Sequence, residues 1–447
     1  MPSDDKKTKF ALIGTGSRAM MFIEPIVTTF KETSELVALS DTNPTRLEYY
    51  NNLLKNDFGK SEVPTYDPKE FSKMIKDTKP DKVIVTTIDS FHDEYIIKSM
   101  EHGCDVITEK PMTINAEKCQ NILKTIDKTG RKLRVALNYR WSAGATQIKK
   151  LINTGLIGKV LHVDMEYWLN TNHGADYFRR WHRQKNNSGG LIVHKSSHHF
   201  DLINWWINSV PDSVFAMGQL SFYGSENASL HEIDPNLISR YQNLSTKNDP
   251  FALDLNSDDK LKKLYLDAET HDGYIRDQNV FSKGITTEDS IGVLVKYRND
   301  TLLNYSLNAY LPREGYRVAF NGSKGRLEYE EIHPNSLSSN KNLNADEQPK
   351  KWEGSMKFFP NFGKPKSIDL DKINEGSHGG GDSLLQNQIF SKNQKKDILN
   401  RDAGHEQGAA SILIGIAANE SMKTKKSVKI SNICPQLNHA TFLNELE

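Results

Sequence analysis

The chain has 447 residues, of which 37% are hydrophobic and 26% are charged. Its 58 Lys and Arg nearly balance its 57 Asp and Glu, and its three cysteines are scattered. Neither nucleic acid, nor a membrane surface, nor a disulfide framework is indicated. No apolar run reaches the ~18 residues of a membrane span or resembles a secretion signal. We therefore expect a cytoplasmic protein of two domains.

The first third of the chain alternates predicted strands and helices. Apolar runs of strand length occupy Phe10–Ile13, Leu36–Asp41, Asp81–Thr87 and Cys104–Met112, and helical apolar spacing follows the first of them. A helix over 115–130 and a strand over 131–141 complete the series. Alternation of this kind predicts a parallel sheet, so residues 1–140 are expected to form a Rossmann-type α/β domain.

A glycine-rich turn joins the first strand to its helix. The sequence Gly14-Thr15-Gly16-Ser17-Arg18-Ala19 has the form G-x-G-x-x-A, in which the small residues allow a tight turn and close approach of a pyrophosphate. The helix N-terminus would add free N–H groups. Asp41 ends the second strand, where a carboxylate accepts the ribose hydroxyls and repels a 2′-phosphate. NAD is therefore favoured over NADP, with Arg46 close enough to leave the choice open.

Further polar residues lie at strand ends. Thr87, Lys110 and Asn138 each follow a predicted strand. Ligands of open α/β sheets collect at the carboxyl ends of the strands, so these residues are expected near Gly14 and Asp41.

Residues 141–447 have the texture of a second domain. Alternating runs at 159–169, 214–223, 291–297, 301–308 and 316–321 predict a large, mostly antiparallel open sheet in an α/β domain. A polar stretch of about 225–285 is too long for an ordinary loop and is expected to be an insertion or a binding lid, closed by Tyr274–Phe281. Ser336–Lys350 is expected to be a mobile surface loop.

Motifs along the whole chain resemble one family. The first part of the chain resembles the glucose–fructose oxidoreductase / inositol dehydrogenase (Gfo/Idh/MocA) family. The motifs that carry the resemblance are the glycine turn, Asp41, the TTIDSFH segment that ends at His92, Glu109-Lys110-Pro111 and LNYR at 137–140. Five later motifs extend the resemblance: GLIGKV, GGLIVHKSSHHFD, GYRVAFNGSKGRLE, HGGGD at 378–382 and the C-terminal GIAANESMKTKKSVKI. One residue departs from it, because Ile88 stands where the family usually has Pro.

The resemblance implies a set of cofactor and catalytic residues. It implies that NAD is bound by Gly14, Thr15, Gly16, Ser17, Arg18, Asp41, Arg46, Thr87, His92, Glu109, Lys110 and Asn138. It also implies a cis peptide before Pro111 and a Lys110 ammonium that stabilises developing charge on the substrate oxygen.

The segment HKSSHHFD, residues 194–201, is the second catalytic candidate. Alignment on Gly189, Gly190 and Asp201 places the family's proton-transfer His at His198 and its Asp at His194. An imidazole titrates near neutral pH and suits a general base. The spacing puts His194, His198 and Asp201 on one helical face, with His199 directed elsewhere and structural. Asp201 would then orient His198, bind substrate or be buried with a hydrogen bond.

A metal site is the alternative for this segment. His194 and His198 stand at i and i+4, and His173 or His182 would supply a third ligand. The H-E-x-x-H pattern is absent and no cysteine lies nearby in the sequence, so we expect no metal.

The substrate is expected to be a carbohydrate or polyol. Residues 167–184 are dense in aromatic, Arg and His residues, which suit sugar rings and their hydroxyls or a charged group. The candidates for substrate contact are Tyr139, Arg180, His182, Lys195, Asp201 and Arg276.

These features predict an NAD-dependent dehydrogenase that transfers hydride from a carbinol, with Lys110, His198 and His194 as catalytic residues. Two alternatives stay open. One is a redox-neutral glycosidase that keeps NAD bound and works by oxidation and elimination, with His194 abstracting the acidified C–H proton. The other is a non-catalytic dinucleotide-sensing regulator. The resemblance also implies a homodimer or homotetramer.

Overall fold

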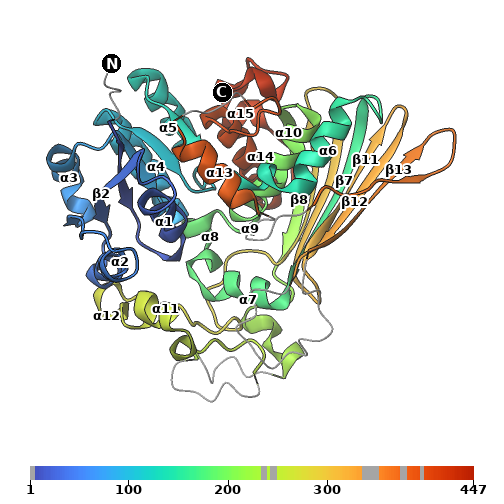
Figure 1. Ribbon diagram of the computed structural model, residues 1–447. Helices are drawn as coiled ribbons and strands as arrows, with labels where there is room; N and C mark the ends of the chain where they lie inside the picture. The colour runs from blue at the N-terminus through green and yellow to red at the C-terminus, as the bar shows by residue number, and fades with distance from the viewer. Residues whose placement is uncertain (1–5, 233–238, 242–248, 335–351, 373–379, 393–396) are drawn as a thin grey trace, which may run out of the picture.

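The structure, a computed structural model, describes residues 6–232, 239–241, 249–334, 352–372, 380–392 and 397–447. Two sheets organise the chain (Figure 1). The first has the strand order β3-β2-β1-β4-β5-β6 and the second the order β14-β13-β12-β11-β7-β10-β9-β8-β15. The predicted segments 336–350 and His378 of the HGGGD motif lie outside the described residues.

The first sheet is parallel throughout and confirms the predicted Rossmann-type domain. Its strands are β1 Thr8–Ile13, β2 Ser34–Ser40, β3 Thr65–Tyr66, β4 Lys82–Val85, β5 Asp105–Thr108 and β6 Leu133–Val135. The helices between them are α1 Met20–Val27, α2 Pro44–Asn56, α3 Phe71–Thr78, α4 His92–Glu101 and α5 Ala116–Thr129. The central strands are buried on both faces, which explains their continuous apolar runs.

The second sheet is antiparallel except where β10 lies parallel to β7. Its strands are β7 Val160–Asn170, β8 Pro211–Gln219, β9 Ser290–Tyr297, β10 Leu302–Leu311, β11 Gly315–Gly322, β12 Gly325–Ile332, β13 Glu353–Pro360, β14 Lys366–Ser367 and β15 Val428–Lys429. Alternate residues of β9 are buried and exposed, so one face packs inward and the other stays open. This confirms the predicted mostly antiparallel open sheet.

Helices cover the inner face of the second sheet (Figure 1). They are α6 Ala143–Asn153, α7 Thr171–Arg179, α10 Ser197–Ile207, α14 His405–Thr424 and α15 Ile430–Ile433. Two one-turn helices, α8 Lys185–Ser188 and α9 Leu191–His194, lie between α7 and α10 in the chain, and α8 contacts the 3₁₀ turn Asp89–Phe91 of the first domain. The buried α10 and α14 supply much of the apolar core beneath the sheet. Within the described residues, no helix has both the length and the apolar character needed to cross a bilayer.

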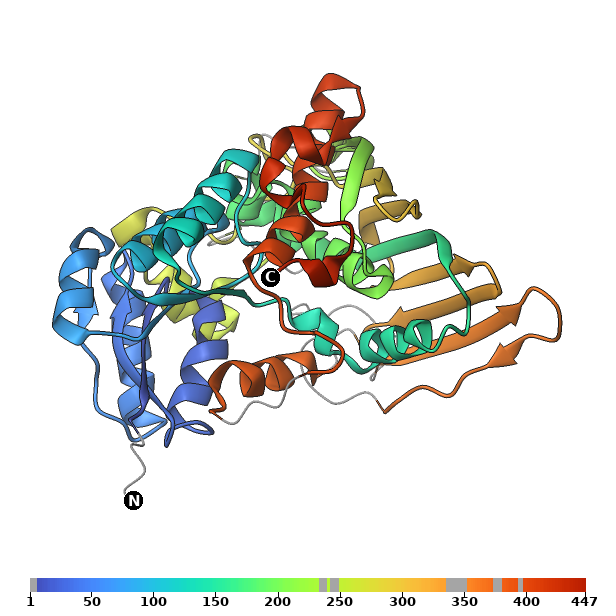
Figure 2. The same ribbon diagram turned by 90° about the horizontal axis from the view of Figure 1, so that it is seen from above.

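Two segments from the second half of the chain return to the first sheet. The insertion carries α11 Asp259–Leu261, a π-helical turn over 262–266 and α12 Glu269–Asp272, and these lie beside α2 (Figure 1). Helix α13, Gly381–Phe390, packs on α1 (Figure 2), and its Phe390 ring lies 5.3 Å from that of Phe10. The core of the Rossmann-type domain therefore includes residues far beyond position 140.

Candidate active site

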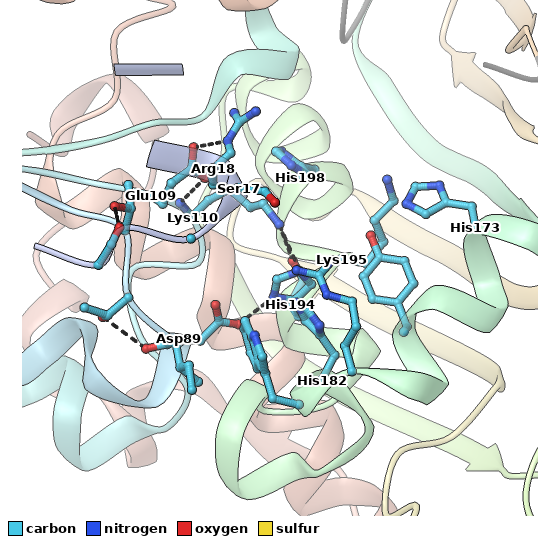
Figure 3. Close-up of a pocket in the computed structure, with 18 of the residues that line it drawn as sticks. Ser17, Arg18, Asp89, Glu109, Lys110, His173, His182, His194, Lys195 and His198 are labelled. Atoms are coloured by element: carbon cyan, nitrogen blue, oxygen red, sulfur yellow. Dashed lines mark hydrogen bonds and ion pairs between the residues drawn. The ribbon is translucent and has the colours of Figure 1, made fainter. Parts of the chain in front are cut away.

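A cavity of about 1730 Å³ is lined by both domains. One wall is formed by the carboxyl ends of β1, β2 and β4, and the opposite wall by β7, α7 and residues 180–198. Figure 3 shows Lys110, His194 and His198 facing this space together. The sequence-based expectation that ligand-binding groups gather at strand ends agrees with this arrangement.

The glycine turn lies at the end of β1 and leads into a 3₁₀ turn, Ser17–Ala19, before α1 begins. Gly14 has φ +94°, and a Cβ atom there would lie 2.6 Å from the Thr86 carbonyl carbon and the Thr87 nitrogen. Only glycine can make this approach to β4. Gly14, Gly16, Ser17 and Arg18 line the cavity, as expected for a pyrophosphate-binding turn.

Asp41 is tied to the glycine turn. Its Oδ2 accepts hydrogen bonds from the Thr15 amide at 2.6 Å and the Thr15 hydroxyl at 2.9 Å, and its Oδ1 accepts one from the Asn43 amide. Asp41 remains on the cavity wall. Thr15 is fully buried and serves the turn rather than the cavity surface.

Arg18 is held by two carboxylates. Its Nε donates to Glu109 at 2.6 Å, and its Nη1 lies 3.4 Å from Asp382, which also accepts a hydrogen bond from Asn138. Burial alone would lower the pKa of Arg18, but the two carboxylates raise it. Arg18 and Glu109 line the cavity, whereas Asn138 is directed to Asp382 and away from the expected cofactor contact.

His92 supports the strand ends from behind. Its Nδ1 lies 2.8 Å from the Pro111 carbonyl and its Nε2 lies 3.2 Å from the Thr87 carbonyl. The peptide bond between Lys110 and Pro111 is cis, as the family resemblance implied. Thr87 and His92 both border the cavity, and His92 links the end of β4 to the residue that follows Lys110.

Lys110, His194 and Asp89 form a chain of contacts (Figure 3). Lys110 Nζ lies 3.3 Å from His194 Nε2 and donates to the His194 carbonyl at 3.1 Å. His194 Nδ1 lies 2.5 Å from Asp89 Oδ2. Burial lowers the pKa of Lys110 to about 8, raises that of Asp89 well above its usual range and lowers that of His194 well below its own. Sequence reasoning did not select Asp89.

His198 and Lys195 complete this part of the wall. His198 is only 3% exposed, lines the cavity and has its ring 5.4 Å from that of Tyr139. Lys195 Nζ lies 4.9 Å from the centre of the Tyr167 ring. His199 stacks on Tyr167 and its Nδ1 lies 2.7 Å from the Tyr305 hydroxyl, so its predicted structural role agrees with its position.

Asp201 does not reach the cavity. Both of its oxygens accept hydrogen bonds from the Arg140 guanidinium, at 2.8 and 2.5 Å, and the two side chains are 1% and 0% exposed. The expectation that Asp201 contacts substrate or orients His198 is therefore wrong. Helix α10 is buried along its whole length, and the Arg140–Asp201 ion pair is part of this buried structure.

The helix around HKSSHHFD is also interrupted. Helix α9 ends at His194 and α10 begins at Ser197, so His194 and His198 do not stand one turn apart on a continuous helix. They face different partners, Asp89 and Tyr139. In the part of the chain that the structure describes, no three His, Cys, Asp or Glu side chains are grouped to hold a metal ion.

The remaining substrate candidates divide between the cavity wall and its support. Arg180 and His182 line the cavity, and the His182 ring lies 4.2 Å from that of His194. Arg180 and Arg276 both bind the carboxylate of Asp176, at 3.1 and 2.6 Å, and they hold its pKa below the usual range against the effect of burial. Arg276 lies behind the wall.

The insertion reaches across the cofactor side of the cavity. The Tyr265 hydroxyl lies 3.1 Å from the Ser17 amide and 2.9 Å from the Ser17 hydroxyl. Arg46 donates to the Leu264 carbonyl and forms an ion pair of 2.7 Å with Asp272. These contacts place the insertion against the glycine turn, and the choice between an insertion and a binding lid stays a prediction; Tyr265 itself was not selected. Its separation of 248 residues from Ser17 leaves no local signal.

The far end of the cavity carries a second group of polar residues, of which the sequence analysis named only His173, as a possible metal ligand. His173 Nδ1 lies 2.8 Å from Glu314, and His333 lies 2.9 Å from Glu331. Burial alone would raise the pKa of Glu314, but His173 holds it well below the usual range. The cavity continues beyond Lys195, where it is bordered by Glu314, His173, His333 and Trp352. It therefore has room for more of a substrate than the reacting carbinol alone.

Comparisons with known proteins agree with this architecture. A family model described as "Oxidoreductase family, NAD-binding Rossmann fold" matches residues 8–137, and one described as "Oxidoreductase family, C-terminal alpha/beta domain" matches residues 149–430. The "Putative oxidoreductase YteT" of Bacillus subtilis is 36% identical over 439 residues, which are 94% of this chain and 97% of that protein.

Two more distant relatives match either part of the sequence or the fold of this chain. The "2,7-anhydro-N-acetylneuraminate hydratase" of Mediterraneibacter gnavus is 30% identical over 138 residues, 30% of this chain and 36% of that protein. The crystal structure of an aldose-aldose oxidoreductase from Caulobacter crescentus, complexed with glycerol, has a TM-score of 0.60 at 17% identity and covers 95% of this chain and 100% of that chain. By its two family models and its full-length relative, this chain belongs to the Gfo/Idh/MocA family of oxidoreductases, with an NAD-binding Rossmann domain.

Proposed function

We propose that the protein is an NAD-dependent oxidoreductase that oxidises a carbinol of a carbohydrate or polyol. One observation carries the proposal: Lys110 and His198 border the same cavity that begins at the glycine turn. A substrate beside a dinucleotide on that turn would meet both side chains. The dinucleotide, when bound, would supply the acceptor for hydride.

The residues of this chain would manage the substrate oxygen and its proton. The Lys110 ammonium can donate a hydrogen bond to the reacting oxygen and stabilise the charge that develops on it. The His198 imidazole is placed to exchange a proton with a substrate hydroxyl. Arg180, His182 and Lys195 offer hydrogen bonds to further hydroxyls or to an anionic group on the sugar, and Tyr139, Tyr167 and Tyr177 give the wall its aromatic faces.

The surroundings of Arg46 favour NAD over NADP. Asp272, at 2.7 Å, and Asp41, at 3.7 Å, neutralise its charge, and its Nε is bound to the Leu264 carbonyl. An arginine so engaged offers little to a 2′-phosphate. The Asp41 carboxylate accepts ribose hydroxyls and repels a phosphate at the same position.

The test is a panel of aldoses, uronates and inositols incubated with NAD or NADP, with reduced cofactor followed at 340 nm. We expect turnover with NAD. His198→Ala is expected to lower kcat by about 10²–10⁴-fold. His102→Ala is the matched control, because His102 is exposed and bonded to Ser72 outside the cavity. A His198→Ala variant with unchanged turnover would refute the role of His198.

Redox-neutral cleavage is the second candidate, favoured by the insertion over the glycine turn. Contacts of Tyr265 and Asp272 with the Rossmann domain would retain a dinucleotide through a complete cycle of oxidation and reduction. A relative of the same family is named a hydratase, a reaction without net redox change. Release of nitrophenol from nitrophenyl glycosides without accumulation of NADH would favour this candidate, whereas stoichiometric NADH would exclude it.

A further inference from the structure

The contact chain Lys110–His194–Asp89 is built for proton transfer. Its members come from three separate segments: Asp89 follows β4, Lys110 follows β5 and His194 ends α9. The two ring nitrogens of His194 face different partners, with Nε2 3.3 Å from Lys110 Nζ and Nδ1 2.5 Å from Asp89. An imidazole bonded at both nitrogens can accept a proton at one while it releases a proton from the other.

We propose that His194 and Asp89 convert the Lys110 ammonium into a neutral amine, so that Lys110 can share with His198 the role of proton acceptor; once it has taken the hydroxyl proton, Lys110 is again the ammonium that stabilises the substrate oxygen. The inference rests on the proposed function for its use in catalysis, but not for its test. Lys110 is the catalytic residue because it faces the substrate position. Asp89 is a positioning residue that acts through His194.

The transfer conserves protons and charge. The Lys110 N–H bond breaks as a His194 Nε2–H bond forms, and the His194 Nδ1–H bond breaks as an Asp89 O–H bond forms. Lys110 changes from +1 to 0 and Asp89 from −1 to 0, while His194 stays neutral and exchanges tautomers. The Lys110 amine can then take the hydroxyl proton, and the reverse sequence serves reduction.

The environment lowers the energy difference between the two states. Asp89 is buried and Lys110 is half-buried, and removal from water disfavours the charged pair relative to the neutral pair. It lowers the pKa of Lys110 to about 8 and raises that of Asp89, which brings the two proton affinities together.

His194 is kept neutral by its neighbours, so it is suited to pass a proton rather than to store one. The charged or titratable groups around the contact chain are Arg18, Glu109, Arg180, His182 and Lys195. Lys110, His182, Arg180 and Lys195 all act with burial to lower the pKa of His194.

The arrangement also accounts for the departure at position 194. The family resemblance places an aspartate there, and this chain has histidine. In this chain Asp89 supplies a carboxylate, and the His194 imidazole lies between it and Lys110.

The experiment is trace labelling of lysine amines with acetic anhydride between pH 5.5 and 10, read by peptide mass spectrometry against free phenylalanine. An isolated lysine loses neutral amine tenfold per pH unit below its pKa. Over the pH range in which the Lys110–Asp89 pair holds one proton, internal transfer gives Lys110 a neutral fraction that does not depend on pH, because both states then hold the same number of protons. We therefore expect Lys110 reactivity in the wild-type protein to level off below its pKa of about 8, and to fall again only where the pair takes up a second proton.

Lys149 is the internal reference. Burial also lowers its pKa to about 8, but its Nζ donates to the Trp205 carbonyl and the structure shows no contact of its side chain with a carboxylate among the described residues. Its reactivity should keep falling tenfold per unit. In Asp89→Asn the Lys110 plateau should disappear, and the control Asp93→Asn, which removes an Asp–Lys118 pair outside the cavity, should keep it.

His194→Gln is the second variant should Asp89→Asn fail to fold, and it should also abolish the plateau. A wild-type Lys110 profile that falls tenfold per pH unit to pH 5.5, parallel to Lys149, would overturn the inference. The labelling needs no substrate, so its failure is distinct from failure of the proposed function, which would show as a lack of cofactor reduction across the panel.

Discussion

The buried pair of Arg140 and Asp201 allows a direct test of whether Asp201 is structural or catalytic. Asp201→Ala removes a bidentate partner and leaves a fully buried guanidinium with Gln407 and the Asn400 carbonyl as its acceptors. Loss of one member of such a pair costs about 3–5 kcal/mol, because the remaining charge stays desolvated. We expect the free energy of unfolding to fall by that amount.

Urea unfolding followed by circular dichroism measures the loss, and turnover of the folded protein at low temperature measures catalysis. The double variant Arg140→Met/Asp201→Leu should recover most of the stability, since two apolar side chains leave no buried charge. The structural interpretation would be refuted by Asp201→Ala protein that keeps wild-type stability but loses turnover.

Three further predictions concern cofactor binding and pH. Asp41→Ala should weaken NAD binding and reduce the ratio of NAD to NADP affinity, because the acceptor for the ribose hydroxyls and the charge that repels a 2′-phosphate are both lost. Titrations with each cofactor, followed by protein fluorescence, measure the two affinities. An unchanged affinity ratio would contradict this prediction. Asp272→Asn should speed NADH release about 5- to 30-fold, measured by stopped flow, since an ion pair worth about 1–2 kcal/mol no longer holds the insertion on Arg46. Lys149 binds a proton more readily in the unfolded chain, so wild-type stability should rise between about pH 8 and pH 10.5. Lys149→Met should lack that rise. Equal slopes of unfolding free energy against pH in the two proteins would contradict this prediction.

Much of the fold could be predicted from local patterns. The parallel sheet could be predicted because its strands are continuous apolar runs separated by helices. The turn at Gly14 could be predicted because its φ and its close approach to β4 require glycine. Strands β12 and β13 were missed, although β12 alternates buried and half-buried residues. Their pairing joins segments on either side of the polar stretch at 335–351, which is too long to fix a hairpin register as a short turn would.

The candidate site was less predictable because its contacts are long-range. Asp89 lies 105 residues from His194 and Tyr265 lies 248 residues from Ser17, and no spacing rule connects such pairs. Asp201 shows the opposite error. Its position in a motif suggested chemistry, but motif position does not report whether a carboxylate faces a cavity or a buried arginine.

The return of α13 to the first sheet has a consequence for synthesis of the chain. Phe390, Ile389 and Leu385 complete an apolar core that begins with Phe10, and the insertion adds Leu264 to it. A ribosome completes the Rossmann strands more than 100 residues before it makes Leu264 and more than 200 residues before it makes the side chains of α13. During that interval the nascent first domain exposes apolar surface, a condition that favours chaperone binding. A fragment ending near residue 140 should accordingly aggregate when expressed alone, and addition of the remaining chain in trans should not restore it efficiently.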